Sequence, residues 1–136
     1  MADISRQIAY LYPGITFGPG RDCLIDGDAG AIIEWRRQEP QPTPAELAAA
    51  ELPAAKAATI ASNRSQCSIR IYARYPAGRQ SSVALGIYSG AEAEAQAAIM
   101  KDWIADMVAA ENTAADAIEA ATTVQAVEAV TVAWPV

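Results

Sequence analysis

Side chains that could do chemistry are sparse in this sequence, and histidine is absent. Histidine is the commonest general base and the commonest metal ligand. Neither a Gly-x-Ser-x-Gly pattern nor a Cys-x-x-Cys pair occurs, and the segment Gly18-Pro19-Gly20 lacks the lysine and spacing of a phosphate-binding loop. These absences predict a protein that is not an enzyme and uses no cofactor.

Two sets of carboxylates have spacings that could bind a cation or move a proton. Asp26 and Asp28 could begin a calcium loop, but Ala31 stands where such a loop needs glycine and Arg37 where it needs glutamate. Asp102 and Asp106 lie four residues apart, on one face of an expected helix. A plain turn and a solvated helix face are the favoured interpretations, and we expect no metal site.

Three tryptophans and two cysteines complete the candidates. Trp35, Trp103 and Trp134 could form a sugar-binding platform, although packing in a core or an interface is the favoured interpretation. Cys23 and Cys67 do not make a disulfide framework, and we expect reduced, partly buried thiols in a protein made in the cytosol.

Composition and charge limit the partners. Apolar residues make up 52% of the chain, but many are alanines, which bury little surface, and the aromatic content is 7%. We therefore expect association with further copies or with something larger. The net charge of −6 argues against nucleic-acid binding, and no apolar run is long enough to insert in a membrane. A signal peptide is not indicated.

The charges are segregated along the chain. Residues 52–91 contain basic side chains and no acidic one, whereas residues 92–136 are acidic apart from Lys101. The favoured interpretation is that the basic segment packs beside the acidic one, within the fold or between copies, with a polyanion site as the alternative.

The N-terminal residues predict a helix followed by a β-hairpin. Asp3 can cap a helix over residues 4–12, which Pro13-Gly14 ends. Residues 22–25 and 31–35 form the two arms, and residues 26–30 contain the Asp-Gly turn signal. A lone hairpin is marginally stable, so we expect it to lie on the first helix or on a partner.

Three spaced prolines predict a stiff joint after the hairpin. Pro40, Pro42 and Pro44 favour extended backbone, and Thr43 with Glu46 can form a capping box at the start of the next helix. The predicted parts are residues 1–39, an N-terminal helix plus β-hairpin; residues 40–44, the Pro-rich joint; and residues 45–136, an alanine-rich helical region. The fold class is mainly α with a small N-terminal α+β element.

The helical region has three predicted segments. The first runs from Pro44 to about Tyr75, with Pro53 as a kink; residues 67–74 also alternate like a strand, but helix is favoured. A short element lies between Gly78 and Gly86. Ser89 can cap a helix from Gly90 onward, which Asn112-Thr113 could interrupt, and Thr122 with Gln125 offers a further capping box.

The first fifty residues resemble the XkdW-type proteins that are found beside tail-fibre genes in phages. The resemblance rests on residues 8–13 (IAYLYP), 25–28 (IDGD), 32–35 (IIEW) and 40–47 (PQPTPAEL). Residues 70–80 are also similar to a helix–Tyr-Pro–Arg-Gln–helix unit of phage tail-associated proteins. The resemblance implies no catalytic residues. It implies a structural or accessory role in a bacteriophage tail, in the virion, after synthesis in the host cytoplasm.

We expect the chain to act by protein–protein packing, with other tail proteins of the fibre or baseplate and with further copies of itself. A tail-fibre assembly chaperone that leaves before completion is one alternative, and a glycan- or small-ligand-binding module is another. The candidate interface residues are aromatic and aliphatic side chains of both parts: Tyr10, Tyr12, Trp35, Ile99, Met100, Trp103, Ile104, Met107 and Trp134.

Overall fold

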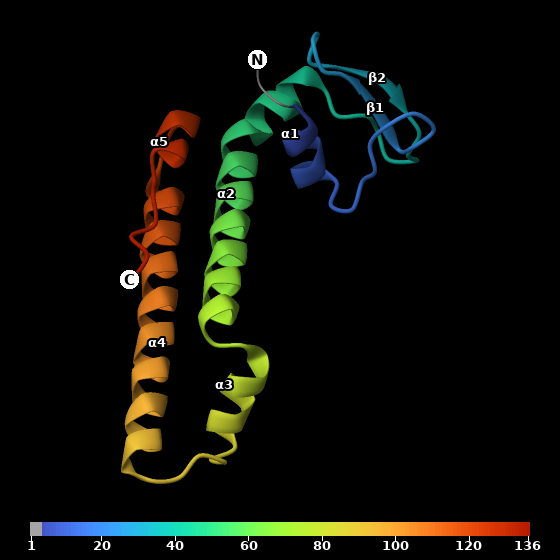
Figure 1. Ribbon diagram of the computed structural model, residues 1–136. Helices are drawn as coiled ribbons and strands as arrows, with labels where there is room; N and C mark the ends of the chain where they lie inside the picture. Colours follow the sequence, from blue (N-terminus) through green and yellow to red (C-terminus); the bar gives the residue numbers. More distant parts are fainter. Residues whose placement is uncertain (1–3) are drawn as a thin grey trace. The chain divides into compact units, whose positions relative to one another are not determined.

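A computed structural model describes residues 4–136 (Figure 1). Its elements are α1 (Ile4–Leu11), β1 (Cys23–Asp26), β2 (Ala31–Trp35), α2 (Pro44–Arg74), α3 (Ala77–Ala84), α4 (Ala91–Ala120) and α5 (Val124–Glu128). The chain is mainly helical, with a small hairpin after a short helix, which confirms the predicted fold class. Asp3, the predicted cap of α1, lies outside the described residues.

The chain divides into two compact units. The first unit runs to Thr59 and includes Ala121–Glu128, so it holds α1, the hairpin, the start of α2, and α5. The second unit consists of Ile60–Ala120 and Ala129–Val136. The boundaries predicted from sequence, at residues 40–44, stay a prediction.

Hydrogen bonds within the turn stabilise the hairpin. β1 pairs antiparallel with β2, with an irregularity between Leu24 and Ile25. At the turn, Asp26 Oδ1 accepts hydrogen bonds from the Asp28 and Ala29 N–H groups, at 3.0 and 3.1 Å. Gly30 adopts a φ of 62° and donates to the Asp26 carbonyl. The Asp26 side chain thus stabilises the turn that the Asp-Gly dipeptide predicts.

A small apolar core joins the hairpin to the helices of the first unit. It contains the fully buried Ile8 and Cys23, together with Ile4, Ile15 and Leu47. Half-buried Trp35 and Ile32 of β2 pack against it. The hairpin is therefore supported by α1 and by the start of α2, as the marginal stability of an isolated hairpin requires.

The start of α2 has the predicted capping box. The Thr43 N–H donates to Glu46 Oε2 at 2.8 Å, and the Glu46 N–H donates to Thr43 Oγ1 at 3.2 Å. Pro53 lies inside the helix, and Figure 1 shows a bend in the first turns of the ribbon. α2 continues through residues 67–74, so the helical interpretation of that segment is confirmed.

Several local boundaries differ from those expected. Gly78 lies inside α3. α4 begins at Ala91, and the Gly90 carbonyl accepts the first hydrogen bond of the helix. Gly90, with a φ of 101°, therefore occupies the cap position that was predicted for Ser89. α4 also passes through Asn112-Thr113 without interruption because alanines on both sides favour helix.

The last capping site is also one residue later than predicted. Thr123 Oγ1 accepts from the Ala126 N–H at 3.1 Å, and the Thr123 carbonyl accepts from Val127. Thr123 is therefore the cap of α5, in place of Thr122, and Gln125 does not occupy the reciprocal position of the box.

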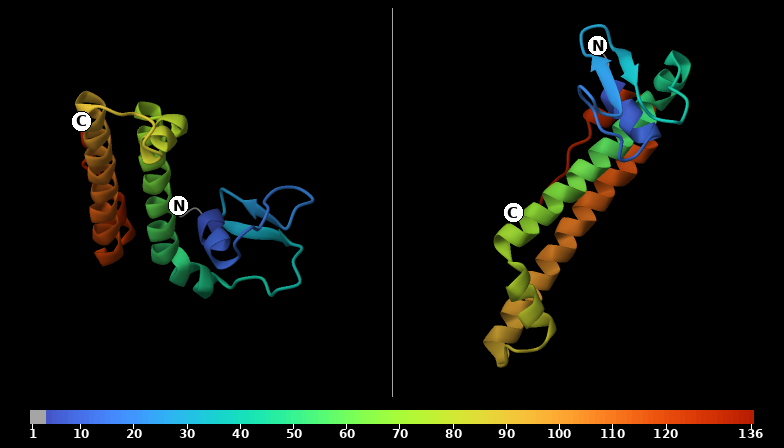
Figure 2. Two further views of the ribbon diagram at one scale, coloured as in Figure 1. Left: turned by 90° about the horizontal axis from the view of Figure 1, so that it is seen from below. Right: turned by 90° about the vertical axis from the view of Figure 1, so that its right-hand side faces the viewer.

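The second unit is a pair of long helices with an extended segment along it. The last part of α2 and α4 run side by side in Figures 1 and 2. Its buried side chains include Cys67 of α2 and Met100, Met107, Ala114 and Ile118 of α4. Within residues 4–136, no helix is long and apolar enough to cross a membrane.

Candidate functional site

Two aromatic rings hold the proline joint of the first unit. Tyr12 follows α1 and Trp35 ends β2, and their ring centroids lie 5.1 Å apart in an edge-on arrangement. The Tyr12 hydroxyl donates to the Pro40 carbonyl at 2.7 Å, and Trp35 Nε1 donates to the Glu39 carbonyl, also at 2.7 Å. Both rings therefore fix the backbone where the chain leaves the hairpin. We call Tyr12, Trp35, Arg37, Glu39 and Pro40 the proline clasp.

An arginine completes the proline clasp. The Arg37 guanidinium lies 5.8 Å from the Tyr12 ring centroid, 3.9 Å from Asp22 Oδ2, and it donates to both carboxylate oxygens of Glu39. The hydrogen bond from Arg37 lowers the pKa of Glu39 from 4.5 to about 2, and it raises the pKa of Arg37 in turn. The clasp thus combines aromatic contacts with a bidentate ion pair.

A buried glutamine links α1 to α2. Gln7 is 4% exposed, and its Nε2 donates to the Leu47 carbonyl at 2.9 Å. A buried amide without a partner would cost free energy, so this bond fixes how the two helices pack. Together with the clasp, it makes the first unit a small, specifically bonded structure.

A groove lies beside β2 in the same unit. Its walls are residues at the start of β2, α1, the proline joint and the first turns of α2, and its volume is about 420 Å³. The apolar lining side chains are Ile4, Ile32, Pro42, Pro44 and Leu47. Gln7, Gln41 and Glu51 supply the polar lining. We call this the edge groove.

In the second unit, arginines lie over the rings of both tryptophans. Arg74 lies 4.5 Å from the Trp103 ring centroid and Arg70 lies 5.1 Å from that of Trp134. Tyr75 meets Trp103 edge-on at 5.7 Å. Arg74 Nη1 also donates to the Val136 carbonyl at 3.3 Å. The contacts of Arg70 with Trp134 and of Arg74 with Val136 hold the extended segment Ala129–Val136 along the helices.

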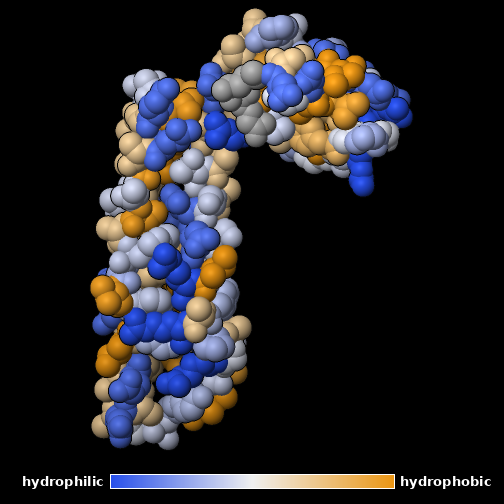
Figure 3. All heavy atoms as spheres, turned by 45° about the horizontal axis from the view of Figure 1, so that its top comes forward, coloured by the Kyte–Doolittle hydropathy of each residue, from blue (hydrophilic) through white to orange (hydrophobic). Residues whose placement is uncertain are grey.

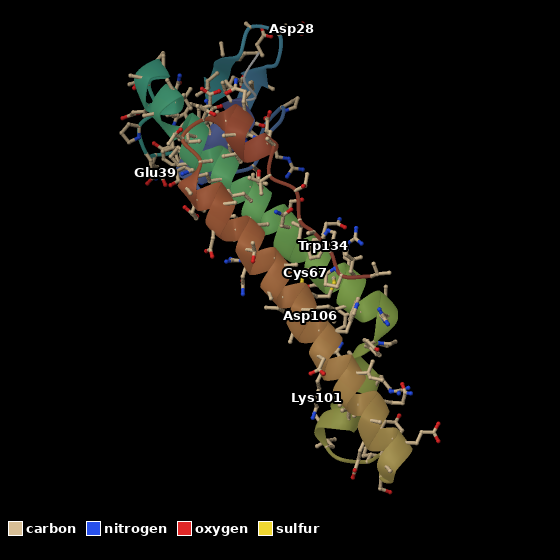
Figure 4. The ribbon with its side chains drawn as sticks, turned by 90° about the vertical axis from the view of Figure 1, so that its left-hand side faces the viewer. Asp28, Glu39, Cys67, Lys101, Asp106 and Trp134 are labelled. Carbon is tan, nitrogen blue, oxygen red and sulfur yellow. The ribbon has the colours of Figure 1, made fainter. Side chains whose placement is uncertain are left out.

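The predicted interface residues have different environments. In the first unit, Tyr12 and Trp35 meet in the clasp, whereas Tyr10 is exposed. In the second, Met100 and Met107 are buried and Ile99 is exposed. Trp103, Ile104 and Trp134 are half-buried, and Figure 4 shows where Trp134 lies. Whether any of them contacts a partner stays a prediction.

The two cysteines are buried and unpaired. Burial raises the pKa of both thiols, with a smaller contribution from Asp22 at Cys23 and from Glu111 at Cys67. A raised pKa keeps a thiol protonated and weakly nucleophilic. Asp28 lies at the tip of the hairpin and Asp106 on α4 (Figure 4), and over residues 4–136 no group of three metal-ligating side chains occurs.

The sequence reasoning missed Gln7, Arg37 and Glu39. The partner of Gln7 is a backbone carbonyl forty positions away, which no local pattern indicates. Arg37 and Glu39 pair with each other two positions apart in irregular backbone, where no regular spacing applies. The one feature of the sequence that could have indicated this pair is the position of Arg37 and Glu39 just before Pro40.

Comparison with known proteins found a family match in the N-terminal part of the chain. The family of the XkdW protein matches residues 4–59, and Thr59 is also the residue at which the N-terminal stretch of the first unit ends. Searches of curated proteins and of solved structures each gave no match. Residues 4–59 are therefore similar to the XkdW protein family, which is phage-associated.

Proposed function

We propose that the chain is a structural or accessory component of a bacteriophage tail, in the fibre or baseplate region, and that it acts without catalysis by packing against other proteins. The observation that carries the proposal is the coincidence of the XkdW match with a structural unit held by the proline clasp. A unit fixed by specific hydrogen bonds is suited to present a defined surface to neighbouring proteins. Other tail proteins and further copies of the chain are the proposed partners.

The chemistry of the side chains supports a non-catalytic role. The thiols have raised pKa values, and the clasp carboxylate of Glu39 is committed to Arg37. Asp102 and Asp106 are exposed on α4. General acid–base catalysis needs a group poised to exchange a proton near neutral pH, and neither the buried thiols nor the ion-paired Glu39 meets that requirement.

The test is quantitative mass spectrometry of gradient-purified particles from the source of this sequence. A fixed ratio to a tail protein is the expected result, and the ratio also reports the symmetry of the site. If the chain is present in the lysate but absent from particles, the tail-component proposal is wrong.

That outcome would favour a second function, a tail-fibre assembly chaperone. The loop between α3 and α4 exposes Leu85 by 77% and Ile87 by 64%. Ile87 follows a helix end in which it donates to the Ser82 carbonyl and Gly86 donates to Val83. The apolar residue at this position commonly packs back on the helix. Its exposure here suits transient binding to an unassembled protein, and pull-downs with the fibre protein test it.

A further inference from the structure

β2 has an unpaired side. Among the described residues, the sheet contains β1 and β2 alone, so β2 has a single strand neighbour. A strand at the edge of a sheet presents N–H and C=O groups that can pair with another chain. β2 also exposes Ile33 by 59%. Ile33 lies at the irregularity of the ladder, and Ile32 and Trp35 on either side of it pack toward the core.

The edge groove adjoins the start of this strand, at Ala31 and Ile32, and is open to solvent. Ala31, Gln41, Pro44 and Ala48 line it and are themselves exposed. A volume of about 420 Å³ falls within the roughly 300–1,000 Å³ of typical ligand sites. A strand edge supplies the backbone pairing and the groove supplies room for alternate side chains, which is the combination that binds extended peptides.

The charge of the edge groove selects the peptide. Glu51 is the one ionisable residue that lines it, and across residues 4–136 Glu51 takes part in none of the ion pairs. A half-buried carboxylate beside apolar walls favours an incoming cation. The remaining lining is apolar or amide.

We propose that the edge groove binds an extended segment of a partner protein, which adds as a strand to the free side of β2, places alternate apolar side chains in the groove and pairs a lysine or arginine with Glu51. The inference deepens the proposed function and rests on it only for the origin of the partner, another protein of the particle.

Exposed apolar residues of the second unit are a weaker candidate for this role. On the face seen in Figure 3, they appear as separate spots among polar residues of the helices. Scattered apolar residues of this kind are normal on a protein surface. The edge groove, by contrast, combines a strand edge, an apolar hollow and one unpaired charge in a single place.

The test is selection from a random dodecapeptide library with the full-length chain as bait. We expect enriched peptides with alternating apolar residues and a lysine or arginine at a constant position. Ala48→Trp fills the groove from an exposed position and should weaken binding by about tenfold or more. Ala49→Trp, at an exposed position of α2 that does not line the groove, should leave binding unchanged. Equal melting temperatures of the two variants control for folding.

Two further measurements examine the geometry. Glu51→Lys should change the selected charge from basic to acidic. N-methylation of a selected peptide at every second amide should abolish binding in one register, where the N–H groups face β2, and preserve it in the other. Failure to enrich any sequence, equal binding by Ala48→Trp and the wild type, or equal effects of both methylation registers would overturn the proposal. None of these results depends on the particle analysis, so the proposed function and the groove can fail separately.

Discussion

The two units of this chain are stabilised in different ways. In the first unit, side chains such as Tyr12, Trp35 and Gln7 bond to backbone carbonyls of distant segments. In the second, helices pack through Met107 and Ile118, Arg70 and Arg74 stack on tryptophans, and Arg74 also donates to the Val136 carbonyl. Hydrogen bonds have fixed lengths and directions, whereas apolar packing tolerates some substitution. The comparison teaches that the unit containing residues 4–59 depends on more of these directional side-chain bonds.

Truncation of a core side chain should have the largest effect on stability, and a variant in each unit can test this. Ile8→Ala should lower the free energy of unfolding by about 2–5 kcal/mol, because Ile8 is fully buried and a cavity would remain. Met107→Ala should do the same in the second unit. Urea denaturation measures both, with Ile33→Ala, at an exposed position, as the control. A stable Ile8→Ala variant would contradict the core described for the first unit.

Loss of a clasp hydrogen bond should have an intermediate effect that is confined to the first unit. Tyr12→Phe keeps the ring and removes one donor, so it should cost about 1 kcal/mol. Trp35→Phe removes a donor and also part of a packed ring, so it should cost more. Hydrogen exchange of the joint amides should increase, while exchange in α4 should not change. If the double variant loses more than the sum of the two, the residues of the clasp act as a unit.

The two threonine caps allow a matched comparison. Thr43→Ala should cost about 1 kcal/mol because it removes one side of a reciprocal capping box. Thr123→Ala removes a cap with a single side-chain bond, in front of a helix of five residues, and should cost less. Thermal unfolding of both variants measures the difference; the reverse order would show that α5 depends on its cap more than α2 does.

The smallest effect should be the pH dependence of the Arg37–Glu39 pair. The pKa of Glu39 is lowered from 4.5 to about 2 by the Arg37 hydrogen bond, so the folded state holds the ionised form more strongly than the unfolded chain does. Its contribution is fully present above pH 4.5 and is lost as the pH falls from 4.5 through 2. The difference in Tm between wild type and Glu39→Gln should disappear over that interval. A difference that is constant with pH would exclude the ion pair as its cause.

Much of the secondary structure could be predicted because its signals are local. The Asp26 turn and the Thr43–Glu46 capping box involve residues two or three positions apart, and α2 and α4 follow from alanine content and helical periodicity. The predictions that failed, at Ser89, Gly78, Asn112 and Thr122, concern the ends of helices or interruptions within them. There, neighbouring residues compete for the same position, and small differences in free energy decide which one occupies it.

The sequence by itself determined the fold class and the hairpin with its turn, because each depends on backbone preferences of adjacent residues. Only the tertiary structure decided that Tyr12 and Trp35 hold Pro40 and Glu39, that Gln7 reaches Leu47, and that a groove lies beside β2. Those contacts join residues far apart in the chain, and their positions follow from how the elements pack. Local propensity carries no information about such packing.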